Sequence, residues 1–447
     1  MPSLKKKAYS GAIWTFFGFG LSQFFRLVNN LILTRLLVPE FFGLMAIINS
    51  LILGFTLFSD FGIGQTIIQN KRGDDPNFLN TAWTLQVIRG SSLWLICILI
   101  ASQAANFYQE EQLKWLFPIT GLTLLFSGFN STAIFSLKRR VEVRKSILFE
   151  LTVQIIGLAT MIIWAMFNPT IWSLVIGSLV SSILKMVGSY WLIPGTKNRF
   201  AWHKDSLQGI ISFGKWMFLA TTMVFLAEQS DRLILGKLIP LEILGVYTVA
   251  FTFANIPRQI IKRIGNQVIF PVISLQKELS RATLRLKILR QRRKMLLGVI
   301  LFLAIMVSFG DFLVTLLYDE RYIDASWMLP ILALGVWFSV LFYTSSPCLL
   351  GLGKPVYAAQ GNFCRFLTIS LGLIVGYNLA GVPGAIVVIA ISDLPAYLAI
   401  QYGLWREKIL FIKQDMQATA LFFGFITFLL WIRSLVGLGL PINHLLN

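Results

Sequence analysis

Ionisable side chains inside long apolar stretches are the residues of this sequence with the most evident chemical potential. Eight of them are basic, namely Arg26, Arg89, Lys185, Arg232, Arg258, Lys262, Arg263 and Arg365. Five are acidic, namely Asp60, Glu150, Glu228, Asp231 and Asp393. A guanidinium group offers a fork of N–H donors that fits two oxygens of a phosphate. The balance of charge therefore favours an anionic solute.

The spacing of some of these residues predicts helix faces that border water. One stripe recurs at three- and four-residue steps through Gln23, Arg26, Asn30 and Thr34, and a second through Asn255, Arg258, Lys262 and Asn266. A charge that faces lipid at mid-bilayer costs at least about 2.5–3.5 kcal/mol. The stripes therefore indicate a hydrated cavity. In the alternative interpretation, charges near helix ends reach the interface, or Arg232 pairs with Glu228 or Asp231.

The composition of the chain predicts a membrane protein. Of its 447 residues, 56% are hydrophobic and 13% are charged, whereas soluble domains carry about 25% charged residues. This excludes a soluble enzyme. A net charge of +19 would suggest nucleic acid in a soluble chain, but basic cytoplasmic loops explain it in a membrane protein, so no nucleic-acid partner is expected. Three separated cysteines and two histidines predict neither a disulfide framework nor a metal site.

Runs of about 20 apolar residues predict an all-α polytopic protein with twelve spans and one further span near the C-terminus. They lie near 11–36, 41–68, 82–104, 114–137, 145–167, 170–193, 212–237, 243–271, 295–317, 326–350, 356–379, 383–404 and 415–432. We expect an N-terminal six-helix lobe at 1–194, a cytoplasmic linker at 195–211, a C-terminal six-helix lobe at 212–404 and one or two extra helices at 405–447. The stretch 272–294 is expected to be a basic cytoplasmic loop, with binding to anionic lipid head groups as the alternative.

The distribution of charge outside the spans predicts the orientation. Basic residues gather in alternate loops, such as 138–145 and 277–294, and the intervening loops hold acidic pairs, Glu110-Glu111 and Asp319-Glu320. The positive-inside rule then places the N-terminus in the cytoplasm.

An internal repeat links the two predicted lobes. Residues 30–43 align with residues 232–245, with Leu31/Leu233, Leu36/Leu238, Glu40/Glu242 and Gly43/Gly245 among the identities. Both copies end an odd-numbered span, so the halves have the same orientation. We expect a parallel pseudo-repeat around a central cavity, as in transporters.

Several motifs resemble those of bacterial polysaccharide transporters, a family of the multidrug/oligosaccharidyl-lipid/polysaccharide exporter superfamily. They are the run Leu33–Gly43 with Asp60-Phe-Gly-Ile-Gly64, Asp231–Lys237 with Leu244-Gly-Val-Tyr247, and Phe270-Pro271. Lys138-Arg-Arg140 leading to Glu150 is similar to the colanic-acid-type branch. The resemblance covers residues 1 to about 410.

The resemblance implies a flippase of the bacterial inner membrane that moves a polyprenyl-pyrophosphate-linked oligosaccharide, a precursor of exopolysaccharide or lipopolysaccharide, by alternating access. Expected substrate-binding cations are Arg26, Arg89, Arg232, Arg258, Lys262 and Arg365. Candidates for coupling to H⁺ or Na⁺, the only cofactor-like requirement expected, are Asp60, Glu150, Glu228 and Asp231. Membrane lipids, a polymerase and a chain-length regulator are the further partners implied.

Two other classes of protein remain as alternatives. A membrane-embedded polymerase or glycosyltransferase of the same pathway would need a sizeable outer loop with catalytic acids, whereas Asp319, Glu320 and Asp324 form the only acidic cluster in the short outer loops. A drug/cation antiporter of the same fold would be expected to have an acidic cavity.

Overall fold

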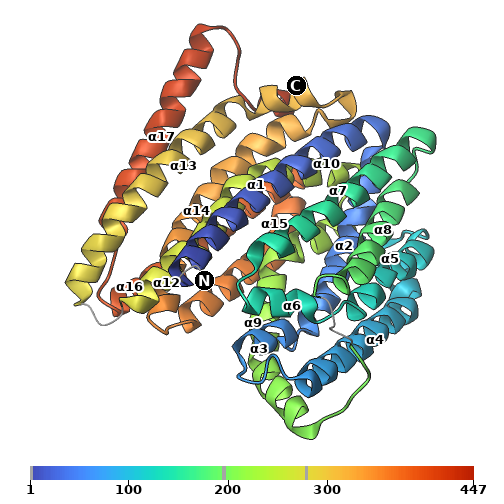
Figure 1. Ribbon diagram of the computed structural model, residues 1–447. Coiled ribbons are helices and arrows are strands. Elements are labelled where there is room, and N and C mark those ends of the chain that lie inside the picture. Colours follow the sequence, from blue (N-terminus) through green and yellow to red (C-terminus); the bar gives the residue numbers. More distant parts are fainter. Residues whose placement is uncertain (1–3, 194–197, 277–279, 447) are drawn as a thin grey trace. The chain divides into compact units, whose positions relative to one another are not determined.

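The computed structural model describes residues 4–193, 198–276 and 280–446, and the regular elements in these ranges are helices (Figure 1). The helices form two compact units. Unit 1 comprises Met1–Phe41 and Ile47–Thr222, and unit 2 comprises Phe42–Ala46 and Met223–Asn447. The prediction of an all-α protein is confirmed.

Unit 1 contains the first eight helices, apart from Phe42–Ala46 of the second helix, and the start of the ninth. They are α1 (Leu4–Leu36), α2 (Pro39–Phe58), α3 (Ile63–Gln69), α4 (Pro76–Tyr108), α5 (Leu113–Gly128), α6 (Ala133–Arg139), α7 (Val143–Phe167), α8 (Trp172–Ser189) and α9 (Lys204–Leu238). Of the expected linker at 195–211, residues 195–197 lie outside the described residues, and α9 begins within it rather than at 212.

Unit 2 contains the end of α9 and the remaining helices. They are α10 (Leu241–Ala254), α11 (Ile256–Ile264), the π-helix η1 (Gly265–Ile269), α12 (Phe270–Leu275), α13 (Arg281–Leu317), the 3-10 helix η2 (Glu320–Tyr322), α14 (Ala325–Gly351), α15 (Val356–Ile391), α16 (Asp393–Arg406), α17 (Ile412–Leu435) and α18 (Asn443–Leu446). Helix α14 is the core of the unit, and its buried Trp337 stacks on Phe422 of α17 with ring centroids 4.7 Å apart.

Eight helices in the described ranges are long and apolar enough to cross a membrane, or nine if the bent pair α5–α6 is one span. The chain is therefore a multi-pass membrane protein, as predicted. The count is lower than thirteen for three reasons. The helices α1 and α9, which hold the predicted spans 11–36 and 212–237, are not among the eight, the predicted spans 114–137 and 243–271 are divided into shorter helices, and Val356–Arg406 counts once. That stretch holds two predicted spans, joined at Ala380 and Gly381, where the backbone leaves the helix and Gly381 has φ +59°.

Two spans predicted as continuous in unit 1 are broken in the structure. The predicted span 41–68 is wrong because α2 ends at Phe58 and the Asp60 carboxylate accepts the N–H of Gly62 at 2.9 Å, with Gly62 in the left-handed conformation. The predicted span 114–137 bends by 57° between α5 and α6. Gln86 holds this bend, because its Nε2 donates to the carbonyls of Ser127, Gly128 and Asn130 at 3.0, 3.2 and 3.1 Å.

Unit 2 corrects two further expectations. The basic loop expected at 272–294 is wrong, because α13 begins at Arg281, where the Ser280 hydroxyl accepts the N–H of Thr283. The predicted span 243–271 is interrupted at Asn255 and continues as α11 and the π-helix. π-helical turns are rare and frequently lie at functional sites, and this one follows the predicted cations of the second polar stripe directly.

The glycines of the internal repeat meet in unit 2. A Cβ atom on Gly43 would lie 2.1 Å from the carbonyl oxygen of Leu241 and 3.1 Å from the backbone nitrogen of Gly245. Only glycine at position 43 allows backbones to approach this closely. The alignment at the repeat thus coincides with a backbone contact, while the parallel arrangement of the halves stays a prediction.

Candidate functional site

A polar cavity of about 320 Å³ in unit 1 collects three of the predicted site residues. Asp60 contributes from the break after α2, Arg89 from α4 and Glu150 from α7. Two further cations complete the charged lining, Lys138 of α6 and Lys185 of α8, and Gln65, Gln86 and Asn130 add amide groups. Five ionisable side chains around one space inside apolar helices form a site that is wet or ligand-filled, because lipid would not solvate them.

The cations of this cavity differ in how firmly they are held. Arg89 is fixed to the end of α2, since its Nε donates to Ser59 Oγ at 2.9 Å and its Nη2 to the carbonyl of Thr56 at 2.5 Å. Lys138 lies 3.5 Å from a carboxylate oxygen of Glu150. Lys185 makes no ion pair with any residue that the structure describes. An incoming anion could therefore use Lys185 without displacing an acid.

Arg26 stands apart from the cavity residues on the long helix α1. Its side chain is exposed, and within the described ranges it has neither an ion pair nor a hydrogen bond. An unpaired guanidinium within a predicted span such as 11–36 is costly unless it contacts water or a ligand. Arg26 is thus the predicted cation whose charge is most available.

Asp393 and two predicted cations of unit 2, Arg258 and Arg365, form one buried ionic cluster. Asp393 of α16 lies 3.4 Å from Arg258 Nη2 on α11 and 3.1 Å from Arg365 Nε on α15. Ser339 of α14 donates to the other carboxylate oxygen. All three charged side chains are less than a tenth exposed. Arg258 and Arg365, predicted as substrate-binding cations, therefore share one buried carboxylate, which balances only one of their two charges.

A second pair lies on the same face of α11, one turn further along. Lys262 Nζ donates to Glu228 Oε1 on α9, and the Tyr343 hydroxyl donates to the same oxygen at 3.2 Å. Both side chains of the pair keep partial access, 35% for Lys262 and 28% for Glu228. Tyr343 also lies under both cations of the stripe, with its ring centroid 5.5 Å from Arg258 and from Lys262.

The remaining predicted residues of α9 find partners other than those considered from the sequence. The Tyr247 hydroxyl donates to Asp231 at 2.5 Å, and Arg232 donates to Gln229 at 3.0 Å and lies over the ring of Phe251. Arg232 thus pairs with neither Glu228 nor Asp231. These contacts hold α9 against α10.

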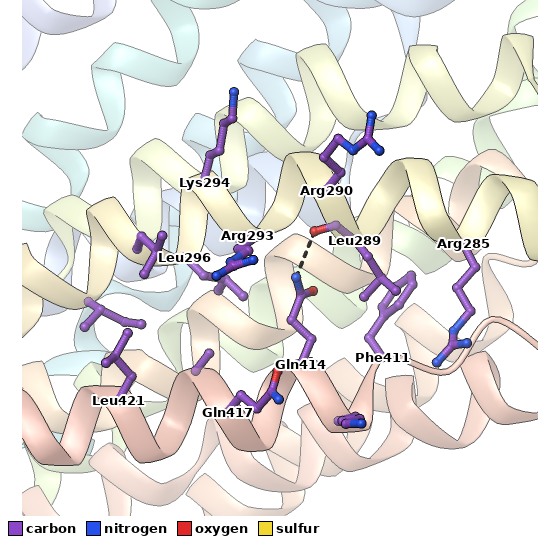
Figure 2. Close-up of a pocket in the computed structure, with 14 residues that line it drawn as sticks. Arg285, Leu289, Arg290, Arg293, Lys294, Leu296, Phe411, Gln414, Gln417 and Leu421 are labelled. Atoms are coloured by element: carbon purple, nitrogen blue, oxygen red, sulfur yellow. Dashed lines mark hydrogen bonds between the residues drawn. The ribbon is translucent and has the colours of Figure 1, made fainter.

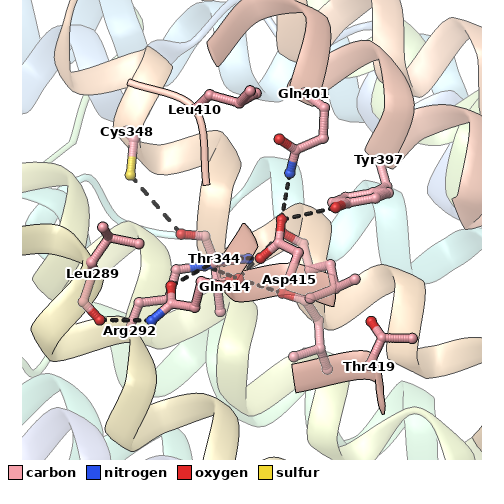
Figure 3. A network of polar contacts seen from close by, with 12 residues as sticks. Leu289, Arg292, Thr344, Cys348, Tyr397, Gln401, Leu410, Gln414, Asp415 and Thr419 are labelled. Atoms are coloured by element: carbon pink, nitrogen blue, oxygen red, sulfur yellow. Dashed lines mark hydrogen bonds and ion pairs between the residues drawn. The ribbon is translucent and has the colours of Figure 1, made fainter. Parts of the chain in front are cut away.

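The sequence did not predict two buried ion pairs that join α17 to α13. Arg292 of α13 pairs with Asp415, which also accepts hydrogen bonds from Tyr397 at 2.8 Å and Gln401 at 2.6 Å (Figure 3). At the other end, Arg433 pairs with Asp311 of α13 at 2.5 Å. Each pair places one acid within a predicted apolar span, Asp311 in 295–317 and Asp415 in 415–432. These two acids were the features of the sequence that could have predicted the pairs.

The fold matches solved transporters. The structure of "Lipid II flippase MurJ, inward closed conformation" superposes with a TM-score of 0.76 and 16% identity, covering 96% of this chain and 93% of that one. An inward-facing multidrug resistance MATE family transporter of the MOP superfamily gives a TM-score of 0.65 at 14% identity, covering 89% and 95%. The fold is thus that of this transporter superfamily.

The chain belongs to the family described as "Polysaccharide biosynthesis protein", whose model matches residues 32–327. Among its relatives, the teichuronic acid biosynthesis protein TuaB of Bacillus subtilis is 23% identical, over 79% of this chain and 73% of its own. The lipopolysaccharide biosynthesis protein WzxC of Escherichia coli is 22% identical, over 86% and 77%. The family predicted from the motifs is confirmed.

Proposed function

We propose that this protein is a flippase that carries a polyprenyl-pyrophosphate-linked oligosaccharide across the bacterial inner membrane for polysaccharide biosynthesis. Family membership supports this function, and so do the names of its relatives, which include a succinoglycan biosynthesis transport protein of Rhizobium meliloti. The fold supports it as well, because transporters with internal repeats work by alternating access, and a repeat is predicted for this chain.

The observation that carries the proposal is the charged cavity of unit 1. Three cations and two acids line a space of about 320 Å³ within apolar helices. A sugar pyrophosphate needs both hydrogen-bonding groups and positive charge along its path, and an apolar lining would reject it. Arg89 and Lys185 supply charge for the phosphates, and Gln65 and Asn130 supply amides for sugar hydroxyls. Arg26 and Arg232 are further cations for the same substrate.

The ion pairs of unit 2 offer a way to couple binding to an ion. A pyrophosphate oxygen that contacts Lys262 replaces Glu228 as the partner of its ammonium group. The released Glu228 carboxylate then binds a proton or Na⁺, and the reverse exchange expels the substrate. Asp60, Glu150 and Asp231 are the other coupling candidates, and Arg258 and Arg365 respond through Asp393. In this scheme the protein forms no covalent bond with the glycan and is not an enzyme.

The charges of the loops support the membrane side from which the substrate enters. Basic segments such as 138–145 support an N-terminus in the cytoplasm, so the substrate enters from the cytoplasmic leaflet. Membrane lipids surround the helices. A polymerase and a chain-length regulator are the partners that would consume the flipped product.

The test is flipping of a fluorescent polyprenyl-pyrophosphate oligosaccharide in proteoliposomes. We expect wild type to move the lipid and Arg26→Ala and Arg258→Ala to stop it, since each removes one guanidinium from a predicted substrate path. Lys114→Ala is the matched control, because Lys114 lies in the first turn of α5 and its one ion pair with a described residue is to the exposed Glu111. Thermal unfolding of each variant distinguishes lost transport from lost folding.

Three other outcomes of this experiment would contradict the function or the site residues. A wild type that leaves the lipid in place and elongates or transfers its glycan would establish the polymerase or glycosyltransferase alternative. A wild type that exchanges organic cations for protons instead would establish the antiporter. Transport that survives both arginine substitutions would keep the function and reject Arg26 and Arg258 as substrate-binding residues.

A further inference from the structure

A groove of about 1000 Å³ lies between α13 and α17, and no residue of α11 lines it (Figure 2). Its wall on α13 runs from Arg285 to Ile300, and its wall on α17 runs from Phe411, just before the helix, to Leu421. All of its lining belongs to unit 2.

The groove has a cationic end and an apolar end. Five basic residues and no acid line it, and the basic residues are Arg285, Arg290, Arg293, Lys294 and Lys413. The apolar lining follows along the helices through Leu296, Leu297, Ile300, Ala418 and Leu421. Figure 2 shows Arg285 and Leu421 at opposite ends of the groove.

The charges of the groove are available to a ligand. Arg290, Arg293, Lys294 and Lys413 are exposed, and no residue in the described ranges forms an ion pair with them. Arg285 Nε donates to the carbonyl of Leu410 at 2.9 Å, which leaves the two Nη atoms of this side chain for a ligand. The nearest acid on α17, Asp415, is 2% exposed and already pairs with Arg292, so it does not neutralise the groove.

The spacing along α13 matches an amphiphile. Arg290, Lys294 and Leu297 follow one another at four- and three-residue steps and so share a helix face. The rise from Arg290 to Leu297 is about 10 Å along the helix axis. A ligand with a phosphate beside Arg290 and Lys294 can therefore lay a hydrocarbon chain over Leu297 and Ile300.

The walls of the groove are held in place by buried polar contacts. Arg292 pairs with Asp415 and Arg433 pairs with Asp311, so α13 and α17 run parallel and are joined at both ends. Gln414 adds a hydrogen bond from its Nε2 to the carbonyl of Leu289 at 2.8 Å (Figure 2). Such buried pairs are costly to break, and the groove is preformed.

We propose that this groove is a binding site for an anionic phospholipid of the cytoplasmic leaflet. Clusters of four to eight Lys or Arg next to membrane helices attract acidic head groups, and the charge distribution predicts that residues 281–294 lie on the cytoplasmic side. The head-group phosphate contacts Arg290, Arg293 and Lys294, and the acyl chains follow Leu297 and Leu421. The proposal does not depend on the transport activity.

The experiment uses the full-length protein in nanodiscs and a phosphatidylglycerol that carries a photoreactive group on one acyl chain. Phosphatidylcholine with the same acyl chain is the head-group control. After illumination, mass spectrometry of peptides locates the label. We expect phosphatidylglycerol to label residues 296–300 and 418–421 at least about fivefold more than phosphatidylcholine, because each basic residue near the lipid favours the acidic head group by about that factor.

Two variants separate the groove from general charge. Arg290→Gln/Arg293→Gln/Lys294→Gln should lower labelling of both segments about tenfold or more. Lys71→Gln/Arg72→Gln/Lys204→Gln removes three exposed cations of unit 1 and should leave it unchanged. Leu421→Trp, at a position that is 40% exposed, keeps every charge, fills the apolar end and should also lower the labelling.

Three results would overturn the proposal. Equal labelling by the two head groups would show that charge does not select the ligand. Labelling that persists in the groove triple variant would exclude its cations. Displacement of phosphatidylglycerol by a polyprenyl pyrophosphate at lower concentration than by unlabelled phosphatidylglycerol would assign the groove to the transport substrate.

Discussion

Lys262 and Glu228 form an ion pair between α11 and α9, and Tyr343 donates to the carboxylate oxygen that Lys262 contacts. The pair is the only one in the described part of the chain that joins two predicted site residues of opposite charge. It keeps partial solvent access, whereas the neighbouring Arg258–Asp393 pair is buried. An exchange of partners is therefore easier at Lys262 than at Arg258, because a buried charge that loses its partner costs more.

The first prediction concerns coupling. Glu228→Gln should keep substrate binding but abolish the dependence of flipping on a proton or sodium gradient, because the amide holds no charge for an ion to balance. Flipping rates in proteoliposomes with and without each gradient measure this. Glu242→Gln, in the exposed first turn of α10, is the control. An unchanged gradient dependence in Glu228→Gln would remove Glu228 from the coupling mechanism.

The second prediction concerns the attachment of α17. Asp415→Ala leaves the Arg292 guanidinium buried without its carboxylate and should destabilise the protein by about 3–5 kcal/mol. Unfolding in detergent measures the loss, with Glu111→Ala, whose side chain is 93% exposed, as the control. Arg292→Met/Asp415→Leu should regain much of the stability, because apolar side chains of similar size often replace a buried pair well. A single variant as stable as wild type would contradict the structural role.

The third prediction concerns the repeat glycine. Gly43→Ala should destabilise unit 2 by about 1–3 kcal/mol, since the new methyl group meets the backbone of Leu241, which cannot rotate away as a side chain can. Gly298→Ala is a matched control in α13, because nothing lies within 4 Å of its Cβ position, and it should be neutral or slightly stabilising. Equal unfolding temperatures for the two variants would argue against the close contact.

The fourth prediction concerns the bend between α5 and α6. Gln86→Leu leaves three carbonyl oxygens without their donor and should cost about 1–3 kcal/mol. It should also reduce flipping, because Asn130 at the bend lines the charged cavity of unit 1. Unfolding and flipping are measured together, with Gln69→Leu at the exposed end of α3 for comparison. A stable variant with full transport would show that the bend does not depend on Gln86.

The sequence predicted the class of protein and the positions of most helices correctly because both depend on local properties. Apolar runs of about 20 residues mark spans wherever they occur, and the motifs around Glu40, Gly43 and Asp231 were sufficient for the family. The breaks in the helices were harder to predict. At the break, the Asp60 carboxylate accepts the N–H of Gly62, and at the bend after Gly128 the donor Gln86 comes from another helix.

The amino-acid sequence by itself determined that this chain spans the membrane many times and that ionisable side chains lie inside its spans. Only the tertiary structure decided which of these side chains are paired with an opposite charge and which remain able to bind a substrate. Arg258 and Asp393 lie 135 positions apart in sequence, and no local pattern links them. Arg26 has no partner among the described residues, yet it has the same chemistry and the same helical spacing as Arg258. Packing of distant helices sets the distance between charges, and that distance determines whether a cation is neutralised or free to bind a substrate.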